Sequence, residues 1–514
     1  MRLAMFLGDW LGRRALLTPE KVAIVDRAGT GREVTYREWN RAANRSARLL
    51  DSLGIARGDR VAVLAHNGLD FLELWFACGK LGTILQPLNW RLTARELEAL
   101  IDDAGPKLLA YGPEFVDRVR EIRSGQDASW LGLALDGSAR AADEDHCHHE
   151  RQGLDDGPLA AVDLGWDDPW VLCYTGGSTG RPKGAVLTHG NIAWNAINTA
   201  VSWGLTADDV AILNAPLFHT GGLNVFTAPL VHLGGTSIVC RGFDVEQVYD
   251  LIDEGRVTIF FGVPTMFLAL QEHPRWRTTD FRRLKLVISG GAPCPAIIHE
   301  RFWERSVPFK TGYGLTEAGP NTFWLPDGDV RRKPGSVGFP LFHIDIRIVD
   351  QAGRDCGPDE VGELLIRGPH VCAGYWNRPE ETARTIRDGW LRTGDLARRD
   401  AEGYAFIVGR LKDLIISGGE NVYPAEVESV LAAHPAVAEA ALIGVPDPKW
   451  GESPRAVVAL KPGATLSLPE LREFAARWLA RYKLPVSLIA VVSLPRTAAG
   501  KIDKSQLKKD HGHP

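Results

Sequence analysis

A glycine-rich stretch in the first half of the chain has the residue types of a phosphate-binding loop. Residues 174–184 read YTGGSTGRPKG and combine four glycines with serine, threonine and lysine side chains. Glycines let backbone amide groups converge on one point, and hydroxyl and ammonium groups bind oxyanions. The candidate ligands of the anion are Thr175, Gly176, Gly177, Ser178, Thr179, Gly180 and Lys183. This composition indicates a polyphosphate site, although a surface turn explains a glycine-rich loop equally well.

Two familiar loop motifs fit this stretch poorly. A Walker loop requires Gly-Lys-Ser/Thr after a four-residue gap, and residues 174–184 lack that ending. Residues 176–180 formally match GxSxG, the turn that carries the nucleophile of α/β-hydrolases. That turn leads from a strand directly into a helix, but RPKG at 181–184 is a poor helix start. The sequence therefore disfavours a hydrolase.

The bulk composition limits the classes of protein to consider. A chain of 514 residues is longer than the ~250–300 residues that one core supports, so at least two domains are expected. The net charge of −5 argues against nucleic acid as the main partner, because phosphate binding needs a clustered basic face. Seven cysteines without a CxxC pair fit reduced thiols and a cytoplasmic protein. The N-terminal residues 1–17 are interrupted by Asp9 and predict an amphipathic helix instead of an export signal, and no membrane span is predicted.

Alternating strands and helices dominate the first two thirds of the chain. A strand at 60–65, a helix at 69–80 and a strand from 83 give a βαβ rhythm, which recurs with strands at 257–261 and 286–291. Residues 136–156 are polar and predict a surface loop. After residue 335, short strands separated by turns predict a β-rich subdomain, and a compact α+β unit follows. The predicted fold class is α/β. A large N-terminal domain (1–409) of parallel α/β subdomains plus a β-rich subdomain precedes a small, mobile α+β C-terminal domain (410–514).

Five motifs in order resemble those of one enzyme superfamily. Residues 174–184 resemble the phosphate loop of adenylate-forming enzymes, usually YTSGTTGxPKG; Gly176 and Ser178 replace a serine and a threonine, so one hydroxyl fewer is available. The other four are YGLTE (313–317), WLRTGD (390–395), GRLKD with SGGE (409–413 and 417–420) and PRTAAGKI (495–502). By this resemblance the chain is identified as a member of the superfamily of acyl-CoA synthetases, luciferases and peptide-synthetase adenylation domains. It is most similar to a bacterial acyl-CoA synthetase.

The resemblance implies a two-step reaction with ATP, Mg²⁺ and coenzyme A as cofactors. A carboxylate is a poor acyl donor, because its charge repels nucleophiles and oxide is a poor leaving group. The family transfers AMP to the acid with release of pyrophosphate, and a thiol then displaces AMP. The implied partners are therefore a small carboxylic acid, ATP and coenzyme A; a homodimer is left open.

The resemblance also assigns the nucleotide contacts. Tyr313 flanks adenine, Thr316 contacts phosphate and Glu317 holds Mg²⁺. The remaining assignments are Gly314 beside Tyr313, Gly291 and Ala292 between nucleotide and acid, Asp395 at the ribose hydroxyls, and Arg410 at ribose or phosphate. Each residue has an ordinary structural explanation as well, such as a turn-forming aspartate or a salt bridge at the domain joint for Arg410.

Lys501 is the predicted catalytic lysine. Two anions, the carboxylate and the α-phosphate, must approach each other, and a point charge between them offsets the repulsion. The resemblance implies that the C-terminal domain then rotates about a hinge at Lys412. This removes Lys501 and places Gly418 along the thiol tunnel, where a glycine leaves room for pantetheine. Catalytic roles are thus predicted for Lys501, Thr316, Glu317 and also His219, which would border the carboxylate pocket unless it is a core histidine.

The predicted acid is a hydrophobic monocarboxylate. The segments 261–265 and 289–292 carry no charge for a second carboxylate or an amino group. A fatty or an aromatic acid fits, with a slight preference for fatty acyl. The alternative function is a stand-alone adenylating enzyme that loads a carrier-protein thiol, and a catalytically inactive binding protein is disfavoured by Glu317, Asp395 and Lys501. The run HCHH at 146–149 is interpreted as a solvated loop in preference to a zinc site.

Overall fold

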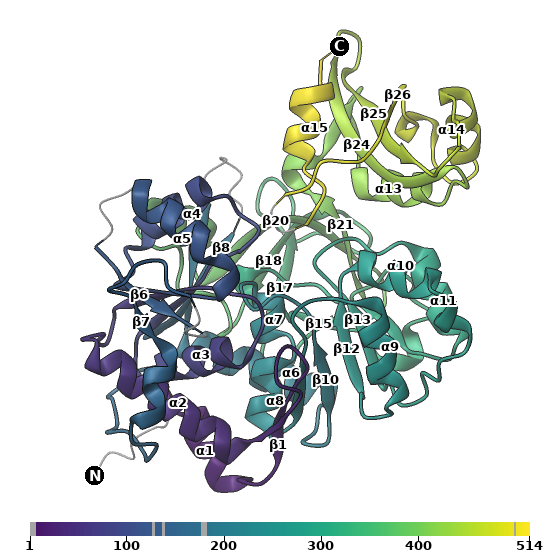
Figure 1. Ribbon diagram of the computed structural model, residues 1–514. Helices are drawn as coiled ribbons and strands as arrows, with labels where there is room; N and C mark the ends of the chain where they lie inside the picture. Colours follow the sequence, from purple (N-terminus) through teal and green to yellow (C-terminus); the bar gives the residue numbers. More distant parts are fainter. Residues whose placement is uncertain (1–6, 126–128, 136–138, 176–181, 498–499, 514) are drawn as a thin grey trace.

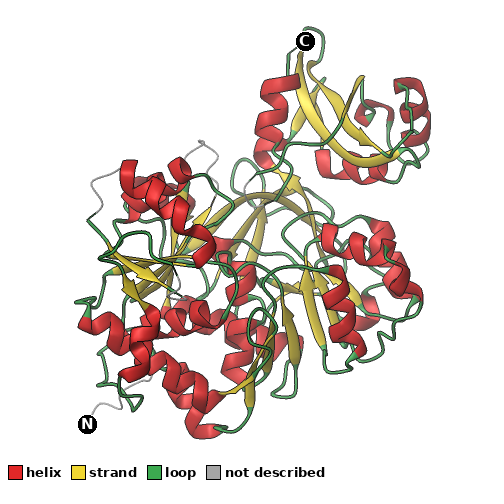
Figure 2. Cartoon of the chain, in the orientation of Figure 1, coloured by secondary structure: helices red, strands yellow, loops and turns green. Residues whose placement is uncertain are grey.

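The computed structural model describes residues 7–125, 129–135, 139–175, 182–497 and 500–513. A large N-terminal body carries a smaller C-terminal unit, which is set apart at the top of the view (Figure 1). Helices surround the sheets of the large body (Figure 2). The predicted α/β class, with parallel sheets, a β-rich part and a small C-terminal unit, is confirmed. Within the described part of the chain, no helix has the length and apolarity needed to cross a bilayer.

The first large sheet contains the strand that leads into the glycine-rich loop. Its order is β7-β6-β5-β3-β4-β8-β9, and all neighbouring pairs are parallel except β8 with β9. The strands are β3 (Arg60–Leu64), β4 (Ile84–Pro87), β5 (Leu108–Tyr111), β6 (Leu131–Ala134), β7 (His146–Cys147), β8 (Pro169–Thr175) and β9 (Lys183–Thr188). The helices of this part are α2 (Tyr36–Ser52), α3 (Leu69–Leu81), α4 (Ala94–Ala104) and α5 (Val116–Gly125). The chain turns sharply where α3 ends, because Gly82 adopts a φ of 69° that favours glycine.

The second large sheet is parallel except at its edge. Its order is β14-β13-β12-β10-β11-β1-β2, with β2 antiparallel to β1. The strands are β1 (Val22–Asp26), β2 (Glu33–Thr35), β10 (Val210–Leu213), β11 (Thr236–Val239), β12 (Ile259–Gly262), β13 (Leu286–Ser289) and β14 (Phe309–Thr311). The helices are α1 (Trp10–Leu17), α6 (His189–Trp203), α7 (Thr220–Asn224), α8 (Thr227–Leu233), α9 (Val245–Asp253), α10 (Pro264–Glu272) and α11 (Ala296–Glu304). Because the central strands are covered on both faces, β10, β12 and β13 are mostly apolar, and the last two were visible in the sequence.

A five-stranded antiparallel sheet follows and ends at the C-terminal unit. Its order is β17-β18-β20-β19, with β21 paired to β20. The elements are β17 (Asp345–Val349), β18 (Gly362–Arg367), α12 (Pro379–Thr385), β19 (Ile386–Arg387), β20 (Trp390–Arg399) and β21 (Ala405–Arg410). Two short strands, β15 (Phe323–Trp324) and β16 (Phe339–Pro340), pair before it. The β-rich subdomain predicted after residue 335 is thus present.

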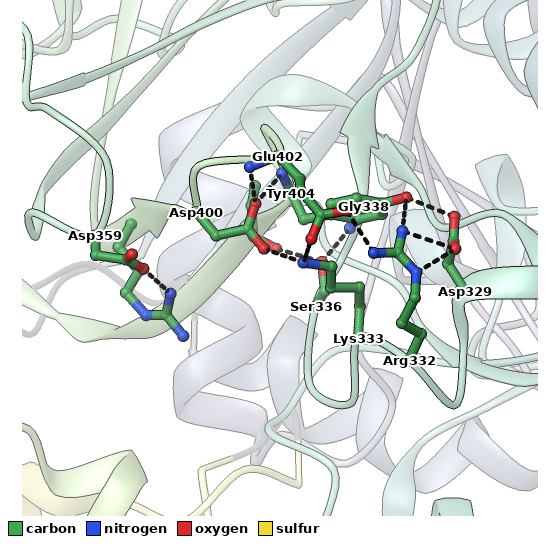
Figure 3. Close-up of polar contacts among 11 residues, drawn as sticks. Asp329, Arg332, Lys333, Ser336, Gly338, Asp359, Asp400, Glu402 and Tyr404 are labelled. Atoms are coloured by element: carbon green, nitrogen blue, oxygen red, sulfur yellow. Dashed lines mark hydrogen bonds and ion pairs between the residues drawn. The ribbon is translucent and has the colours of Figure 1, made fainter.

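A network of charged side chains fixes the turn between β20 and β21. Lys333 Nζ lies 2.7 Å from Asp400 Oδ2 and 2.5 Å from Glu402 Oε1 (Figure 3). Arg332 binds Asp329, Glu402 and the hydroxyl of Tyr404. Arg332 and Lys333 are therefore neutralised within the domain by carboxylates of the β20–β21 turn and of Asp329.

The C-terminal unit has its own hydrophobic core. Its elements are β22 (Ile415–Ser417), β23 (Glu420–Val422), α13 (Pro424–Ala432), β24 (Val437–Asp447), β25 (Gly451–Leu460), α14 (Leu468–Ala475), β26 (Ser487–Val491) and α15 (Lys504–His511). The buried clusters on its sheet draw only on residues 415–507, and the other clusters only on residues before 410. The second helix of this unit is shorter than the apolar pattern at 468–482 predicts. The chain turns after Ala475 so that Leu479 and Leu484 reach the same core.

The N-terminal body contains buried histidines, and we expect them to lower its free energy of unfolding in mild acid. Burial lowers the pKa of His189 and His299 to about 4 and that of His370 to about 3, whereas an unfolded histidine has a pKa of ~6.5. Below pH 6.5 the unfolded chain therefore binds protons that the folded chain does not, and stability falls. Each group accounts for about 2 kcal/mol between pH 6.5 and 5. We expect His370→Gln to flatten the decrease of Tm between pH 7 and 5, measured calorimetrically at fixed scan rate.

The exposed His513, replaced by glutamine, is the control for this experiment. That variant should keep the slope of the wild type. Neither ring nitrogen of His370 has a hydrogen-bond partner among the described residues, so protonation of the folded state finds no compensation. An unchanged slope for His370→Gln would contradict the assignment.

Candidate active site

The carboxyl ends of β12, β13 and β14 form one wall of the candidate site. Gly290 N donates to Gly262 O at 3.1 Å, and Gly312 N donates to Ser289 O at 2.7 Å. The segments predicted to line the acid site therefore lie side by side, and YGLTE follows directly. Ligands of open parallel sheets bind at this end of the strands.

Asp395 contacts two other predicted nucleotide-binding residues, Tyr313 and Arg410. Tyr313 Oη donates to Asp395 Oδ2 at 2.6 Å, and Arg410 Nε lies 2.9 Å from Oδ1. Burial and the carboxylate of Asp395 raise the pKa of Tyr313, so its hydroxyl stays protonated and donates. Each carboxylate oxygen can accept a second hydrogen bond. Asp395 therefore keeps capacity to accept further hydrogen bonds, and its binding of ribose hydroxyls stays a prediction.

Glu317 lies in the short helix η4 (Thr316–Ala318) with one carboxylate oxygen engaged. Its Oε1 accepts a hydrogen bond from the Tyr375 hydroxyl at 2.9 Å and a longer one from Thr175 Oγ1 at 3.5 Å. Among the described residues, no cation forms an ion pair with Glu317, and no hydrogen bond reaches Oε2. An unneutralised carboxylate with a free oxygen is the type of ligand that Mg²⁺ prefers. The residues present therefore fit this metal.

Lys501 lies close enough to interact electrostatically with this cluster. Loss of surrounding water lowers the pKa of Lys501 and the nearby Arg410 lowers it further, whereas Asp395 and Glu317 raise it. The turn that carries Lys501 is held by hydrogen bonds from Thr497 N to Lys501 O at 2.7 Å and from Arg496 Nη1 to Gly500 O at 2.8 Å. Lys501, an exposed residue of the C-terminal unit, thus lies within electrostatic range of Asp395 and Glu317 of the N-terminal body.

His219 is a neutral histidine in this arrangement. Burial lowers its pKa to about 4, and the positive charges of Lys501 and Arg91 lower it as well. Its Nδ1 accepts a hydrogen bond from Gly221 N at 3.2 Å. This contact places the ring proton on Nε2, so His219 can donate one hydrogen bond to an anion. It caps the start of α7, where the nearby Gly221 lies against the Phe261 ring.

Lys183 has a protein partner in the structure. It begins β9, opposite Thr175 in the β8–β9 pairing, and its ammonium group forms an ion pair with Glu381. The ammonium group also lies 5.3 Å from the ring centre of Tyr375. The five other predicted loop residues, Gly176, Gly177, Ser178, Thr179 and Gly180, lie outside the described residues.

The remaining predicted residues fall into two groups. Gly291 has a φ of 82° and lies beside Val263, and Ala292 follows it in the acid-binding wall. Gly314 is a packing requirement, because a Cβ there would lie 2.1 Å from Pro320 O. Thr316 is buried. Gly418 is different: it lies in the C-terminal unit, with its N–H bonded to Trp450 O at 2.8 Å, and no described contact joins it to the cluster around Glu317.

Two residues at the site were not predicted from the sequence. Arg91 stacks on the rings of Trp90 and Phe218, 4.8 and 5.5 Å from their centres, and acts electrostatically on His219. Tyr375 binds Glu317 from a segment 58 positions away. Neither residue belongs to a motif, and a lone arginine or tyrosine in a loop gives no signal of function before the chain is folded.

The interpretation of residues 146–149 as a solvated loop is wrong. Cys147 and His148 are buried, since β7 and the short helix η2 (His148–Gly153) pack against α2 and α3. His148 Nδ1 lies 3.0 Å from Asp70 Oδ1, and Nε2 lies 3.0 Å from Ser46 Oγ. Arg151 forms ion pairs with Asp70 and with Glu73. Because the guanidinium group already neutralises both carboxylates, we interpret this cluster as structural.

Comparisons with known proteins identify the family of the chain. The AMP-binding enzyme family matches residues 11–376, and the AMP-binding enzyme C-terminal domain matches residues 426–501. A feruloyl-CoA synthase from Amycolatopsis is 42% identical over 98% of this chain and 99% of its own. A long-chain-fatty-acid–CoA ligase from Mycobacterium tuberculosis is 37% identical over 98% of both chains.

A solved structure of an acyl-activating enzyme has the same fold over almost the whole chain. The o-succinylbenzoate CoA synthetase of Bacillus subtilis, in complex with an acyl-adenylate intermediate, superposes with a TM-score of 0.84 at 33% identity. The match covers 97% of this chain and 98% of that one. The resemblance seen in the five sequence motifs is thereby confirmed, and the chain belongs to the AMP-binding enzyme family.

Proposed function

We propose that this enzyme is an ATP-dependent acid–thiol ligase that converts a hydrophobic monocarboxylic acid into its coenzyme A thioester. In the first step a carboxylate oxygen attacks the α-phosphorus of ATP and pyrophosphate leaves. In the second step the thiol sulfur attacks the acyl carbon and AMP leaves. The observation that carries the proposal is the contact of Tyr313 and Arg410 with Asp395, together with the free carboxylate oxygen of Glu317, within electrostatic range of Lys501.

The first step requires charge neutralisation and positioning. Lys501 is the cation between carboxylate and phosphate, and the Nε2 proton of His219 orients the carboxylate. Asp395 accepts from the ribose, and Tyr313 lies beside the adenine. Glu317 would hold Mg²⁺ through its free oxygen, and the bound ion would neutralise phosphate charge. Preorganised charges of this kind are the largest source of catalysis in phosphoryl and acyl transfer.

The second step requires the C-terminal unit to move. We place the domain boundary at 409/410, so that the short helix η6 (Leu411–Asp413) contains the hinge residue Lys412. Arg410 at this boundary is held to the N-terminal body by its ion pair with Asp395, and between described residues only the local Leu414 N to Arg410 O bond joins residues up to 410 to residues from 414 onward. The β22–β23 hairpin with Gly418 is directed to solvent, since Ile416 and Trp450 are 50% and 47% exposed. Rotation would exchange Lys501 for this hairpin.

An aromatic acid fits the acid-binding wall better than a fatty acid. The half-buried Phe261 lies between two glycines, because added Cβ atoms at Gly221 and Gly290 would be 3.3 and 3.1 Å from its ring. A narrow cavity next to it is lined by apolar groups that include Leu213, Val225 and the Phe261 ring. A flat ring stacked on Phe261 suits such a space, whereas the sequence alone slightly favoured fatty acyl.

A panel of acids tests the proposed function. We expect pyrophosphate release with cinnamate-type acids to exceed that with C8–C16 fatty acids by about tenfold in kcat/KM, because aromatic stacking contributes of the order of 1 kcal/mol. Thioester should form with coenzyme A. Phe261→Ala should reduce this preference by lowering kcat/KM for aromatic acids more than for fatty acids.

The possible results separate the competing functions. No ATP consumption with any acid would overturn the ligase assignment. Adenylation without thioester from coenzyme A, but with transfer to a purified carrier protein, would favour the alternative carrier-loading enzyme. A preference for long fatty acids would overturn the aromatic assignment alone. We also propose a cytoplasmic location, which the seven free cysteines support.

A further inference from the structure

Among the described residues, the hydroxyl of Tyr375 is the closest hydrogen-bond donor to the Glu317 carboxylate. Tyr375 Oη lies 2.9 Å from Oε1, against 3.5 Å for Thr175 Oγ1. The second oxygen, Oε2, receives no hydrogen bond or ion pair from the described residues. The two carboxylate oxygens are therefore unequal: a phenol holds one, and the other is available to a ligand.

The backbone around Tyr375 fixes the position from which it donates. Cys372 N donates to Glu317 O at 2.8 Å, and Val186 N donates to Gly374 O at 2.9 Å. Tyr375 N in turn donates to Thr382 Oγ1 at 2.9 Å. The segment 372–375 is thus bound to η4, to strand β9 and to α12 at once. It holds Tyr375 between the element that carries Glu317 and the strand that leaves the glycine-rich loop.

The same segment lies over the other charged group of this region. Lys183, which begins β9, has its ammonium group 5.3 Å from the centre of the Tyr375 ring, and its ion-pair partner Glu381 comes from α12. Tyr375 therefore lies next to both charged groups: its ring faces the ammonium group of Lys183, and its hydroxyl binds the Glu317 carboxylate. If Glu317 turned toward Lys183 and paired with it, the negative charge of the carboxylate would be neutralised. Its free oxygen would then no longer be available to bind a metal ion.

We propose that Tyr375 is a positioning residue that holds Glu317 with one oxygen directed to the metal ion of the ATP complex. This inference rests on the proposed function, in which Glu317 binds Mg²⁺. Tyr375 does not touch the metal or the nucleotide in this role. It restricts the rotation of the Glu317 carboxylate and keeps that carboxylate apart from Lys183.

Tyr375→Phe tests the inference, because it removes the hydroxyl and keeps the ring over Lys183. We expect the Mg²⁺ concentration for half-maximal pyrophosphate exchange to rise about tenfold, as is typical when a hydrogen bond to a charged group is lost. Binding of Mn²⁺ to the enzyme–ATP complex, measured by electron paramagnetic resonance without acid, should weaken by the same factor. Thioester formation from supplied acyl-adenylate should be unchanged, since that step does not involve the β- and γ-phosphates.

Tyr111→Phe is the matched control. It removes a phenol that donates to a carboxylate, Asp145 Oδ2 at 2.6 Å, in a buried region without nucleotide-binding residues. Equal changes in the two variants, or unchanged Mn²⁺ binding in Tyr375→Phe, would overturn the positioning role. Normal Mn²⁺–ATP binding by a wild-type protein that consumes no ATP would overturn the proposed function alone. Absence of Mn²⁺–ATP binding in the wild type would overturn both.

Discussion

Lys501→Ala is expected to lower acid-dependent ATP–pyrophosphate exchange by about a thousandfold, the upper range for loss of one preorganised charge. The same variant should convert supplied acyl-adenylate and coenzyme A into thioester at the wild-type rate. The reason is that Lys501 neutralises the approach of two anions, which only the first step contains. Single-turnover measurements of each half-reaction check this expectation.

The local structure around Lys501 provides the control. Lys504 lies three residues further on, but its ammonium group forms an ion pair with Glu428 at 2.7 Å within the C-terminal unit. Lys504→Ala removes an equal charge from the same region and should spare both half-reactions. If Lys501→Ala reduced both half-reactions equally, Lys501 would be structural or would serve both steps. The proposal that Lys501 acts only in the first step would then be wrong.

Gly418→Leu is expected to have the opposite pattern, with adenylation intact and thioester formation about a hundredfold slower. Gly418 has a φ of 61°, and a Cβ there would lie 2.7 Å from the Trp450 ring. A leucine must therefore displace Trp450 or distort the hairpin, on the surface that we propose receives the thiol. A displacement of about 1 Å at a reacting geometry is sufficient for a hundredfold loss. Rates of acyl-adenylate formation and of its reaction with coenzyme A give the result.

Backbone strain by itself must be excluded in this experiment. Gly463 also has a positive φ, 75°, and lies in a turn of the same unit with nothing within 4 Å of an added Cβ. Gly463→Leu introduces comparable strain without a contact to Trp450 and should leave both steps unchanged. Slower adenylation in Gly418→Leu, to the same extent as the slower thioester step, would remove Gly418 from the thiol path.

The fold and much of the site could be predicted because their signals are local in sequence. Continuous apolar runs such as 286–289 identify buried parallel strands, and ordered motifs locate Glu317, Asp395 and Lys501 in the chain. The boundaries were less accurate where tertiary packing decides them. The helix that begins at Leu468 ends at Ala475 because Leu479 must reach the core, and no residue between them marks that end.

Contacts between distant segments could not be predicted. His148 is buried because Asp70 binds its ring and Arg151 neutralises Asp70. Each of these three residues is of a type that is usually found at the surface. Likewise, Tyr375 becomes relevant only when the segment 372–375 pairs with β9. A sequence reports the type of a polar residue but not its partner, and the partner determines whether burial of that residue is favourable.

The buried clusters of the two bodies share no residue, and among the described residues the polar link between the bodies is confined to Arg410, which pairs with Asp395 and accepts a hydrogen bond from Leu414 N. Substitutions that reshape the wall around Phe261 therefore leave the folding of residues 415–507 untouched. Acid specificity and thiol specificity can consequently change independently in evolution. A hybrid protein joined within η6 should have the acid specificity of its N-terminal body and the thiol specificity of its C-terminal unit.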